Sequence, residues 1–339
     1  MKRVTLSDVA AHAGVSKATV SMVLNGDPRV AVATRARVQD SLAGLSYIYD
    51  RTAASLRKPT SEAVGMIVTQ LTNPYFAEFA EGIQVELDSR GMDVLLGVSG
   101  EDPERQARLL QSMSERRVDG VVLIPAHGTT AENLGVSHMP LLLLARRVSD
   151  VDADYVGGDN EAGAYAATAH LIIEHNCTRL AFVGGFADSS ARQERLAGFQ
   201  RSAADHGIAI APSNIPTCAP DRLEARAAAR DLLSGETGVP DGLLCFNDVV
   251  ALGVLDILNE TGLRPGVDVK VIGFDDVQAA ASARPALASV SVPAHAAGRR
   301  AAEMLLARVR GDRAEAEELV LATELKPRET CGCTEKEEN

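Results

Sequence analysis

The sequence has no tryptophan, few other aromatic residues and no apolar run long enough to cross a membrane. Its longest apolar stretches, such as MPLLLLA at residues 139–145, fall well short of the ~20 residues that a transmembrane helix needs. The first residues, MKRVTLSD, place no apolar segment behind their basic side chains and do not resemble a secretory signal. We therefore expect neither a membrane protein nor an exported one.

Cysteine is also scarce, with five residues at positions 177, 218, 245, 331 and 333. An odd, scattered set of cysteines is typical of a reducing cytoplasm, where we expect the chain to act. Cys331 and Cys333 flank one glycine in the polar segment 331–339, which we interpret as an inert tail because a metal site would need further ligands nearby. His170 and His175 are five residues apart and would lie on different faces of a helix, so no metal site is expected there.

Motifs for catalysis are missing as well. No GxGxxG or Walker A sequence is present, and the glycines of VGGFADSS at 183–190 are too few to indicate a phosphate-binding loop. The remaining histidines are isolated, and no Ser-His-Asp or Cys-His arrangement has support. We therefore expect no enzymatic activity and no cofactor.

Charge is unevenly distributed along the chain. The net charge of −12 argues by itself against nucleic acid as a partner, but residues 1–60 hold nine basic and four acidic side chains, a local +5 that leaves −17 for the remainder. This asymmetry indicates a small module that seeks anions, attached to an acidic body. The length of 339 residues also favours two or three domains.

Residues 5–45 predict three short helices. Thr5 and Asp8 can cap the first, and Gly14 can end it in the left-handed conformation. Ser16 can cap the second after a very short turn, which is typical of a helix-turn-helix, although an ordinary helical hairpin is the alternative. The side chains expected between the three helices are Val9, Ala13, Val20, Val23, Leu24, Thr34, Val38, Leu42 and Leu45.

The outward face of the second helix favours binding to DNA, because Lys17, Ser21 and Met22 can reach the base edges of a major groove. The whole stretch TLSDVAAHAGVSKATVSMVLN, residues 5–25, closely resembles the DNA-binding headpiece of the lactose-repressor (LacI) family. The resemblance implies a transcriptional regulator, most often a repressor, that binds double-stranded operator DNA. The operator contacts it implies in the headpiece are Thr5, Leu6, Ser16, Lys17, Ala18, Thr19, Ser21, Met22, Asn25, Arg35 and Tyr47.

Two headpiece positions depart from the family pattern. Met22 stands where many members have an arginine, which removes one charged contact to DNA. Ala31 stands where the third helix often begins with serine, and losing such a cap costs roughly 1 kcal/mol. Neither change is expected to undo the fold of the headpiece, residues 1–48, but both make the operator sequence harder to infer.

Residues 49–60, YDRTAASLRKPT, predict a short hinge after the headpiece. Asp50 can cap a helix and Pro59 ends it, yet a helix this short is marginal in water without packing. The segment resembles the family's hinge helix, which orders on the operator as a pair. That resemblance implies that Ala53 and Leu56 enter the minor groove, with Leu56 as an apolar wedge. A plain exposed linker is the alternative.

From residue 61, strand-like and helix-like segments alternate. Continuous apolar runs such as AVGMIVTQ, VDGVVLIP and VKVIGF are typical of parallel strands covered on both faces by helices. Two such sets predict two α/β subdomains with a cleft at the carboxyl ends of their strands. The region 61–330 resembles the family's periplasmic-binding-protein-like effector domain, which implies chain crossings near 159, 290 and 322. The subdomains would then span 61–158 plus 291–321, and 159–290 plus 322–330.

Polar and aromatic residues at motif positions of the family are expected to line this cleft. Carboxylate, amide and guanidinium groups hydrogen-bond hydroxyls directionally, and an aromatic ring can cover the face of a sugar. The expected effector is a sugar, with nucleosides or other small metabolites as alternatives. Asp159 can instead only cap a helix, and Asp276 is expected to do just that. The proposed effector-binding residues are Asn73, Tyr75, Phe76, Arg146, Asp159, Arg195, Asn247 and Asp275.

Segment 294–310, AHAAGRRAAEMLLARVR, predicts an amphipathic helix that resembles the family's late dimer-interface helix. Each headpiece would read half of a near-palindromic operator, so a homodimer is expected, and the absence of a C-terminal heptad repeat argues against a tetramer. Two other functions compete. A solute-binding protein with the same body would lack residues 1–60 and carry an export signal, and an enzyme on an α/β scaffold would need a catalytic set.

The hinge resemblance generates one prediction. Leu56→Ala should weaken operator binding and leave ligand binding unchanged, because the wedge contacts only DNA. Titrations of the full-length variant with duplex and with ligand measure the two affinities separately. An unchanged operator affinity would remove Leu56 from the interface.

Overall fold

The computed structural model describes residues 4–24, 26–47, 61–135, 139–235 and 238–333. It divides into two compact units, Met1–Pro59 and Thr60–Asn339. The predicted hinge 49–60 with Ala53 and Leu56, and the predicted operator contact Asn25, lie outside the described residues. Among the described helices none is long and apolar enough to cross a bilayer.

The first unit contains the three predicted helices, α1 (Leu6–Ala13), α2 (Lys17–Leu24) and α3 (Val32–Gly44). The Thr5 amide donates to Asp8 Oδ2 at 2.8 Å and the Asp8 amide donates to Thr5 Oγ1, which forms a capping box. Gly14 ends α1 with a φ of 63°. The Ser16 hydroxyl accepts from the Thr19 amide at 3.1 Å at the start of α2. The predicted start and end signals of α1 and the cap of α2 are confirmed.

The core of this unit is small. It consists of buried Val9, Ala10, Ala13, Val20, Val23 and Val38, against which Leu24, Leu42, Leu45 and Tyr47 pack. Ala31 precedes α3 without a side-chain cap, as its methyl group requires. The three-helix arrangement therefore rests on these apolar contacts and on the caps of α1 and α2.

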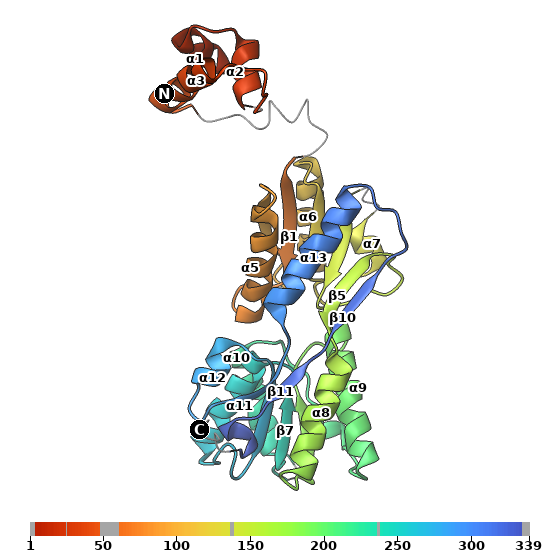
Figure 1. The fold of residues 1–339 in the computed structure, drawn as a ribbon. Helices are drawn as coiled ribbons and strands as arrows, with labels where there is room; N and C mark the ends of the chain where they lie inside the picture. Colours follow the sequence, from red (N-terminus) through yellow and green to blue (C-terminus); the bar gives the residue numbers. More distant parts are fainter. Residues whose placement is uncertain (1–3, 25, 48–60, 136–138, 236–237, 334–339) are drawn as a thin grey trace. The chain divides into compact units, whose positions relative to one another are not determined.

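The body contains two sheets (Figure 1). The first has six parallel strands in the order β10 (Glu318–Leu321), β5 (Asp154–Gly158), β4 (Leu141–Leu144), β3 (Gly120–Leu123), β1 (Ala63–Val68) and β2 (Asp93–Val98). The second has five, in the order β11 (Glu324–Lys326), β9 (Ala288–Ser291), β8 (Lys270–Asp275), β7 (Gly242–Cys245) and β6 (Leu180–Val183). Only β11 runs antiparallel to its neighbour among these strands.

Helices cover both sheets. Those of the first subdomain are α5 (Pro74–Asp88), α6 (Pro103–Glu115), α7 (Ala131–Leu134) and α13 (Ala294–Val309). Those of the second are α8 (Asn160–Ile173), α9 (Ser190–Asp205), α10 (Arg222–Leu233), α11 (Asp248–Thr261) and α12 (Gln278–Ser282), with short 3₁₀ turns η1 (Pro212–Asn214) and η2 (Glu329–Cys331). The chain passes between the sheets after β5, after β9 and between β10 and β11. These three crossings of the chain can act as a hinge between the two subdomains.

Helices α5 and α13 pack side by side through two glycines. A β-carbon on Gly82 would lie 2.1 Å from the His295 carbonyl oxygen, and one on Gly298 would lie 2.3 Å from that of Phe79. The apolar side of α13, including Ala301 and Leu305, is buried within the chain. The apolar face of the amphipathic segment 294–310 is thus covered by the same chain, and the role of this helix in a dimer interface stays a prediction.

This close crossing generates a stability prediction. Gly298→Ala should lower the free energy of unfolding of the body by roughly 1–3 kcal/mol, because its methyl group meets backbone that must move away. Chemical unfolding of the full chain measures the change. The exposed neighbour Ala296→Ser is the control and should stay within about 0.5 kcal/mol of the unmodified chain. Equal free energies of unfolding for the two variants would contradict the close packing of α5 against α13 at Gly298.

Candidate functional site

A cavity lies between the two subdomains, beside the carboxyl ends of β1, β4, β7 and β8. Only about 20 Å³ of it is open to a sphere the size of a water molecule, so its walls lie close together. The lining residues are Gln70, Asn73, Tyr75, Phe76, Ala145, Arg146, Ala191, Arg195, Pro220, Phe246, Asn247 and Asp275. All the predicted effector-binding residues except Asp159 are among them. Ligands of open α/β sheets bind at this end of the strands.

The first turn of α5 supplies one wall of the cavity. Asn73 caps this helix, because its Oδ1 accepts from the Tyr75 amide at 3.1 Å. The Asn73 Nδ2 atom donates to Asp275 Oδ2 of the other subdomain, also at 3.1 Å. Tyr75 and Phe76 are almost fully buried, and the Tyr75 ring meets Phe79 edge-on. The cap therefore fixes both an amide and two aromatic rings at the cleft.

Arg195, on the buried side of α9, is held from several directions. Its Nε donates to Asn160 Oδ1 at 2.8 Å, and one terminal nitrogen donates to the Phe246 carbonyl oxygen at 2.5 Å. The other terminal nitrogen lies 3.5 Å from Asp275 Oδ1, and the guanidinium group stacks 3.7 Å from the centre of the Phe274 ring. A buried arginine with so many partners has one defined position.

Asp275 ends β8 with a φ of 104°, an uncommon backbone conformation for a residue with a side chain. Burial raises the pKa of its carboxyl group to about 6, against the opposing effects of the Arg195 charge and the Asn73 hydrogen bond. The group is therefore ionised at neutral pH. Its two oxygens then have acceptor sites beyond those used by Asn73 and Arg195.

Arg146 follows β4 and lies in the cavity wall. Its two terminal nitrogens bind the carboxylate of Glu101, each at 2.9 Å, and one also donates to the Pro125 carbonyl oxygen. Sequence reasoning missed Glu101, although this acidic residue follows the strand β2 at the same sheet edge. The pair fixes Arg146 and balances its charge.

Two further predicted residues, like Asn73, prove to be helix caps. Asn247 Oδ1 accepts from the Val250 amide at the start of α11, and this residue also lines the cavity. Asp159 accepts from the Ala162 amide at the start of α8 and does not line the cavity. The next residue, Asn160, contacts Arg195. The structure thus favours the alternative that Asp159 only caps a helix, and its role in effector binding stays a prediction.

Further contacts join the subdomains outside the predicted set. Gln70 Nε2 donates to the Pro220 carbonyl oxygen at 3.4 Å, and the Arg147 amide donates to Ser190 Oγ at 2.7 Å. The His127 and Phe186 rings stack with their centres 4.1 Å apart. The cleft is accordingly narrow, with its walls in direct contact. Gln70, His127 and Arg147 lie in the loops that follow β1, β3 and β4, so their position at the carboxyl ends of strands is a signal that could have found them.

A more open hollow lies beside the amino ends of β4 and β5. Leu141, Asp154 and Arg308 are among its lining residues. Arg308 binds both oxygens of Asp154, at 2.8 and 2.6 Å, and so has a structural role there. This end of a parallel sheet is the opposite of the one at which α/β proteins bind ligands.

In the headpiece, α2 presents a mixed outward face. Lys17 and Ala18 are exposed, and Ser21 and Met22 are half-buried. Ser16 and Thr5 are engaged as caps, and Thr19 Oγ1 lies 2.9 Å from Ser16 Oγ. Arg35 donates to the Asp27 carbonyl oxygen at 2.7 Å and so braces the loop before α3. Leu6 and Tyr47 pack against the small core.

The two units correspond to two known kinds of domain. Residues 5–50 match the model described as bacterial regulatory proteins, lacI family, and residues 168–331 match the periplasmic binding protein-like domain. The HTH-type transcriptional repressor PurR of Aliivibrio fischeri (strain MJ11) is 33% identical over 311 residues, covering 90% of this chain and 92% of the relative. The chain belongs to the lacI family of bacterial regulatory proteins.

Solved structures agree with this membership. A complex of the transcriptional regulator CelR with cellobiose has a TM-score of 0.73 and 31% identity, over 97% of this chain and 100% of its own. The lac repressor dimer bound to operator and the anti-inducer ONPF has a TM-score of 0.86 and 25% identity, over 97% and 99%. This lacI-family chain is thus a DNA-binding transcriptional regulator of the repressor type with a small-molecule effector. The alternative of a plain solute-binding protein is excluded.

The buried carboxyl group of Asp275 generates a pH prediction. Its pKa is raised in the folded state, so the folded protein binds a proton more tightly than the unfolded chain does, and stability falls as pH rises from about 4 to about 6. Asp275→Asn cannot ionise and should avoid this loss. The variant should therefore gain roughly 3 kcal/mol relative to the unmodified chain between pH 4 and pH 7.

Chemical unfolding of both proteins at a series of pH values measures this difference. Exposed Asp152→Asn is the control and should show no comparable trend. A stability difference between Asp275→Asn and the unmodified chain that stayed constant from pH 4 to pH 7 would contradict a raised pKa.

Proposed function

We propose that the cleft of this repressor binds a small, neutral, polyhydroxylated molecule, a sugar or a related metabolite, and that its occupancy controls operator binding. The observation that carries the proposal is the buried group of Asn73, Arg195 and Asp275 beside the rings of Tyr75 and Phe76. These side chains offer donors and acceptors at fixed positions next to an apolar face. That combination suits hydroxyl groups on a ring.

The charge balance of the cleft favours a neutral ligand. Arg195 faces Asp275, and Arg146 faces Glu101, so each buried arginine already has a carboxylate partner. An anionic ligand would have to compete with these carboxylates, whereas hydroxyl groups can bond to both members of a pair. The cellobiose in the CelR complex is consistent with this chemistry in a similar fold.

Nucleosides remain the second ligand class, because Tyr75 and Phe76 could also cover a base. A base offers fewer hydroxyl groups to the Asp275 and Arg195 pair than a sugar does. We therefore propose a sugar as the ligand, and a ligand screen distinguishes sugars from nucleosides.

Closure of the cleft would couple the ligand to DNA. Asn73 and Asp275 come from different subdomains, and their direct hydrogen bond is one of the contacts that join the two. A ligand that takes part in this contact changes the angle through the three crossings. The predicted hinge 49–60 directly precedes β1, so the change can reach the headpiece. By linkage, DNA then alters ligand affinity by the same factor.

The proposed regulator acts as a homodimer in the cytoplasm, without chemical turnover. Val85 of α5 and Leu95 and Leu96 of β2 are exposed apolar side chains of the first subdomain that a second chain could cover, whereas α13 exposes Arg299 and Arg300. Two headpieces would place their α2 helices in successive major grooves. Within each headpiece, Lys17, Ala18, Ser21 and Met22 are the proposed base contacts.

Selection of bound duplexes from random DNA tests the regulator, with full-length protein and increasing salt. We expect near-palindromic duplexes with two related half-sites, and an affinity that falls steeply with salt. A screen of sugars and nucleosides for release or strengthening of the selected duplex then tests the ligand. A response to nucleosides alone would reject the sugar, and no preference for any duplex would reject the proposed mode of action.

Arg195→Ala should reduce ligand affinity at least about tenfold while the operator complex stays intact, because the guanidinium group lies in the cleft and not in the headpiece. Calorimetric titration of the ligand and duplex titration measure the two effects. Arg201→Ala, on the exposed side of the same helix, is the matched control and should bind both normally. A normal ligand response in Arg195→Ala would place the binding site elsewhere.

A further inference from the structure

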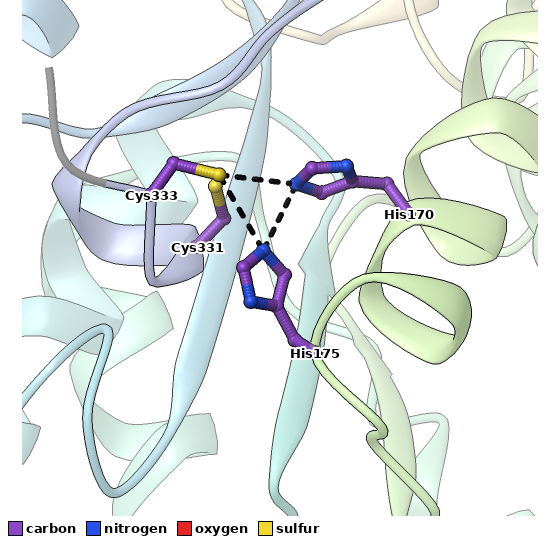
Figure 2. Close-up of side chains that lie close together, drawn as sticks. All are labelled: His170, His175, Cys331 and Cys333. Atoms are coloured by element: carbon purple, nitrogen blue, oxygen red, sulfur yellow. Dashed lines mark hydrogen bonds between the residues drawn. The ribbon is translucent and has the colours of Figure 1, made fainter. Parts of the chain in front are cut away.

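Two histidines and two cysteines converge at the end of the second subdomain that is remote from the cleft. Figure 2 shows His170 and His175 facing the sulfur atoms of Cys331 and Cys333. The four candidate ligand atoms all lie within 4.8 Å of one another. The sequence predicts no further metal ligands near these histidines, and this prediction is wrong because Cys331 and Cys333 lie beside them. The prediction that Cys331 and Cys333 belong to an inert polar tail is wrong for the same reason.

The reason for the error is where the helix ends. Helix α8 stops at Ile173, so His175 lies in the following loop and the five-residue spacing does not separate the two rings on a helix surface. The cysteines come from η2 and the residues after it, far along the sequence but adjacent in space. Cys331 is fully buried.

The distances among three of the four groups match a tetrahedral metal site, whereas the thiol of the fourth, Cys331, donates to the Arg328 carbonyl oxygen at 3.1 Å and would have to release this bond to reach a metal ion. His170 Nε2 lies 3.1 Å from His175 Nε2, and Cys333 Sγ lies 3.7 Å and 3.5 Å from these two atoms. Around a zinc ion with nitrogen ligands at ~2.0 Å and sulfur ligands at ~2.3 Å, neighbouring ligand atoms lie about 3.3–3.8 Å apart. We propose that His170, His175, Cys331 and Cys333 bind one zinc ion as a Cys₂His₂ site.

The chemistry of the four groups supports a cation. Imidazole nitrogens and thiolate sulfurs offer lone pairs, and here these atoms point at one another in a partly buried place. Packing such atoms together is unfavourable unless a proton or a metal ion lies between them. A set of two nitrogen and two sulfur ligands binds zinc in preference to magnesium or calcium, which favour oxygen ligands.

The backbone holds the cysteines ready for this role. Gly332 has a φ of 96°, and a β-carbon there would lie 3.1 Å from both His175 Nδ1 and the Gly266 carbonyl oxygen. Glycine thus allows the turn that brings both sulfurs to one side. The hydroxyl group of Thr330, two residues before Gly332, donates to the Val271 carbonyl oxygen and accepts from the Ala288 amide. Strands β8 and β9 therefore anchor the turn.

Four protein ligands leave no open coordination position, which is typical of structural and not of catalytic zinc. The ion would tie the turn 329–333 to the carboxyl end of α8. The amino end of the same helix carries Asn160, which holds Arg195 at the cleft. The zinc site would therefore fix a helix that reaches the effector site, but its existence does not depend on the identity of the effector.

Metal analysis of full-length protein without a histidine tag tests the site directly. Protein purified with reductant should contain about one zinc ion per chain. Replacement by Co²⁺ should give the intense visible absorption of a tetrahedral site with thiolate ligands. Protein that holds no zinc, takes up no Co²⁺ and has all its thiols free would overturn the proposal. A disulfide between Cys331 and Cys333 under the same conditions would overturn it equally.

Variants locate the ion. Cys333→Ser and His175→Ala should each lower zinc affinity at least about tenfold, whereas the controls Cys218→Ser and His206→Ala, which lie outside the cluster, should keep it. Chelator-treated wild-type chain should regain thermal stability on the order of 5 °C when zinc is returned, a readout that needs no variant to fold. Equal zinc content in all four variants would also refute the assignment.

Discussion

The buried contact among Asn73, Arg195 and Asp275 is the constraint around which the sensor is arranged. An ionised carboxylate away from water must be paired and hydrogen-bonded, and here its partners come from both subdomains. In the proposed mode of binding, a ligand engages the same oxygen atoms that join the two subdomains. Binding would then alter the contact between the subdomains, so one set of atoms would serve both recognition and conformational change.

Helix caps place this contact. Asn73 and Asn247 each use the side-chain oxygen to start a helix, and both residues line the cavity. A residue that caps the helix after a strand thus also brings a polar side chain to the cleft. Arg195 differs, because it reaches the cleft from within a helix and needs Asn160 and the Phe246 carbonyl group to fix its direction.

Local signals explain what could be predicted from the sequence. The capping box at Thr5 and the turn at Gly14 act within a few residues, and the long apolar runs of strands such as β1 and β8 report burial directly. Strands β5 and β9, with the sequences DYVGG and ASVS, are short and rich in glycine or small residues, so no apolar run marks them. Capping alone does not tell which residues reach the cleft, because Asn73 and Asn247 cap helices and line the cavity, whereas Asp159 caps a helix outside it. The cluster of His170 with Cys333 depends on contacts between residues far apart in the chain, which no spacing rule reports.

The positions of β10 and β11 at the edges of the two sheets have a consequence for biosynthesis. Residues 318–326 complete both subdomains, and the η2 turn that follows packs on β8 and β9. Neither lobe can reach its final form until these residues have left the ribosome. The headpiece needs only local contacts and can form much earlier. A nascent chain would therefore carry a folded headpiece while the two subdomains of the body are still incomplete.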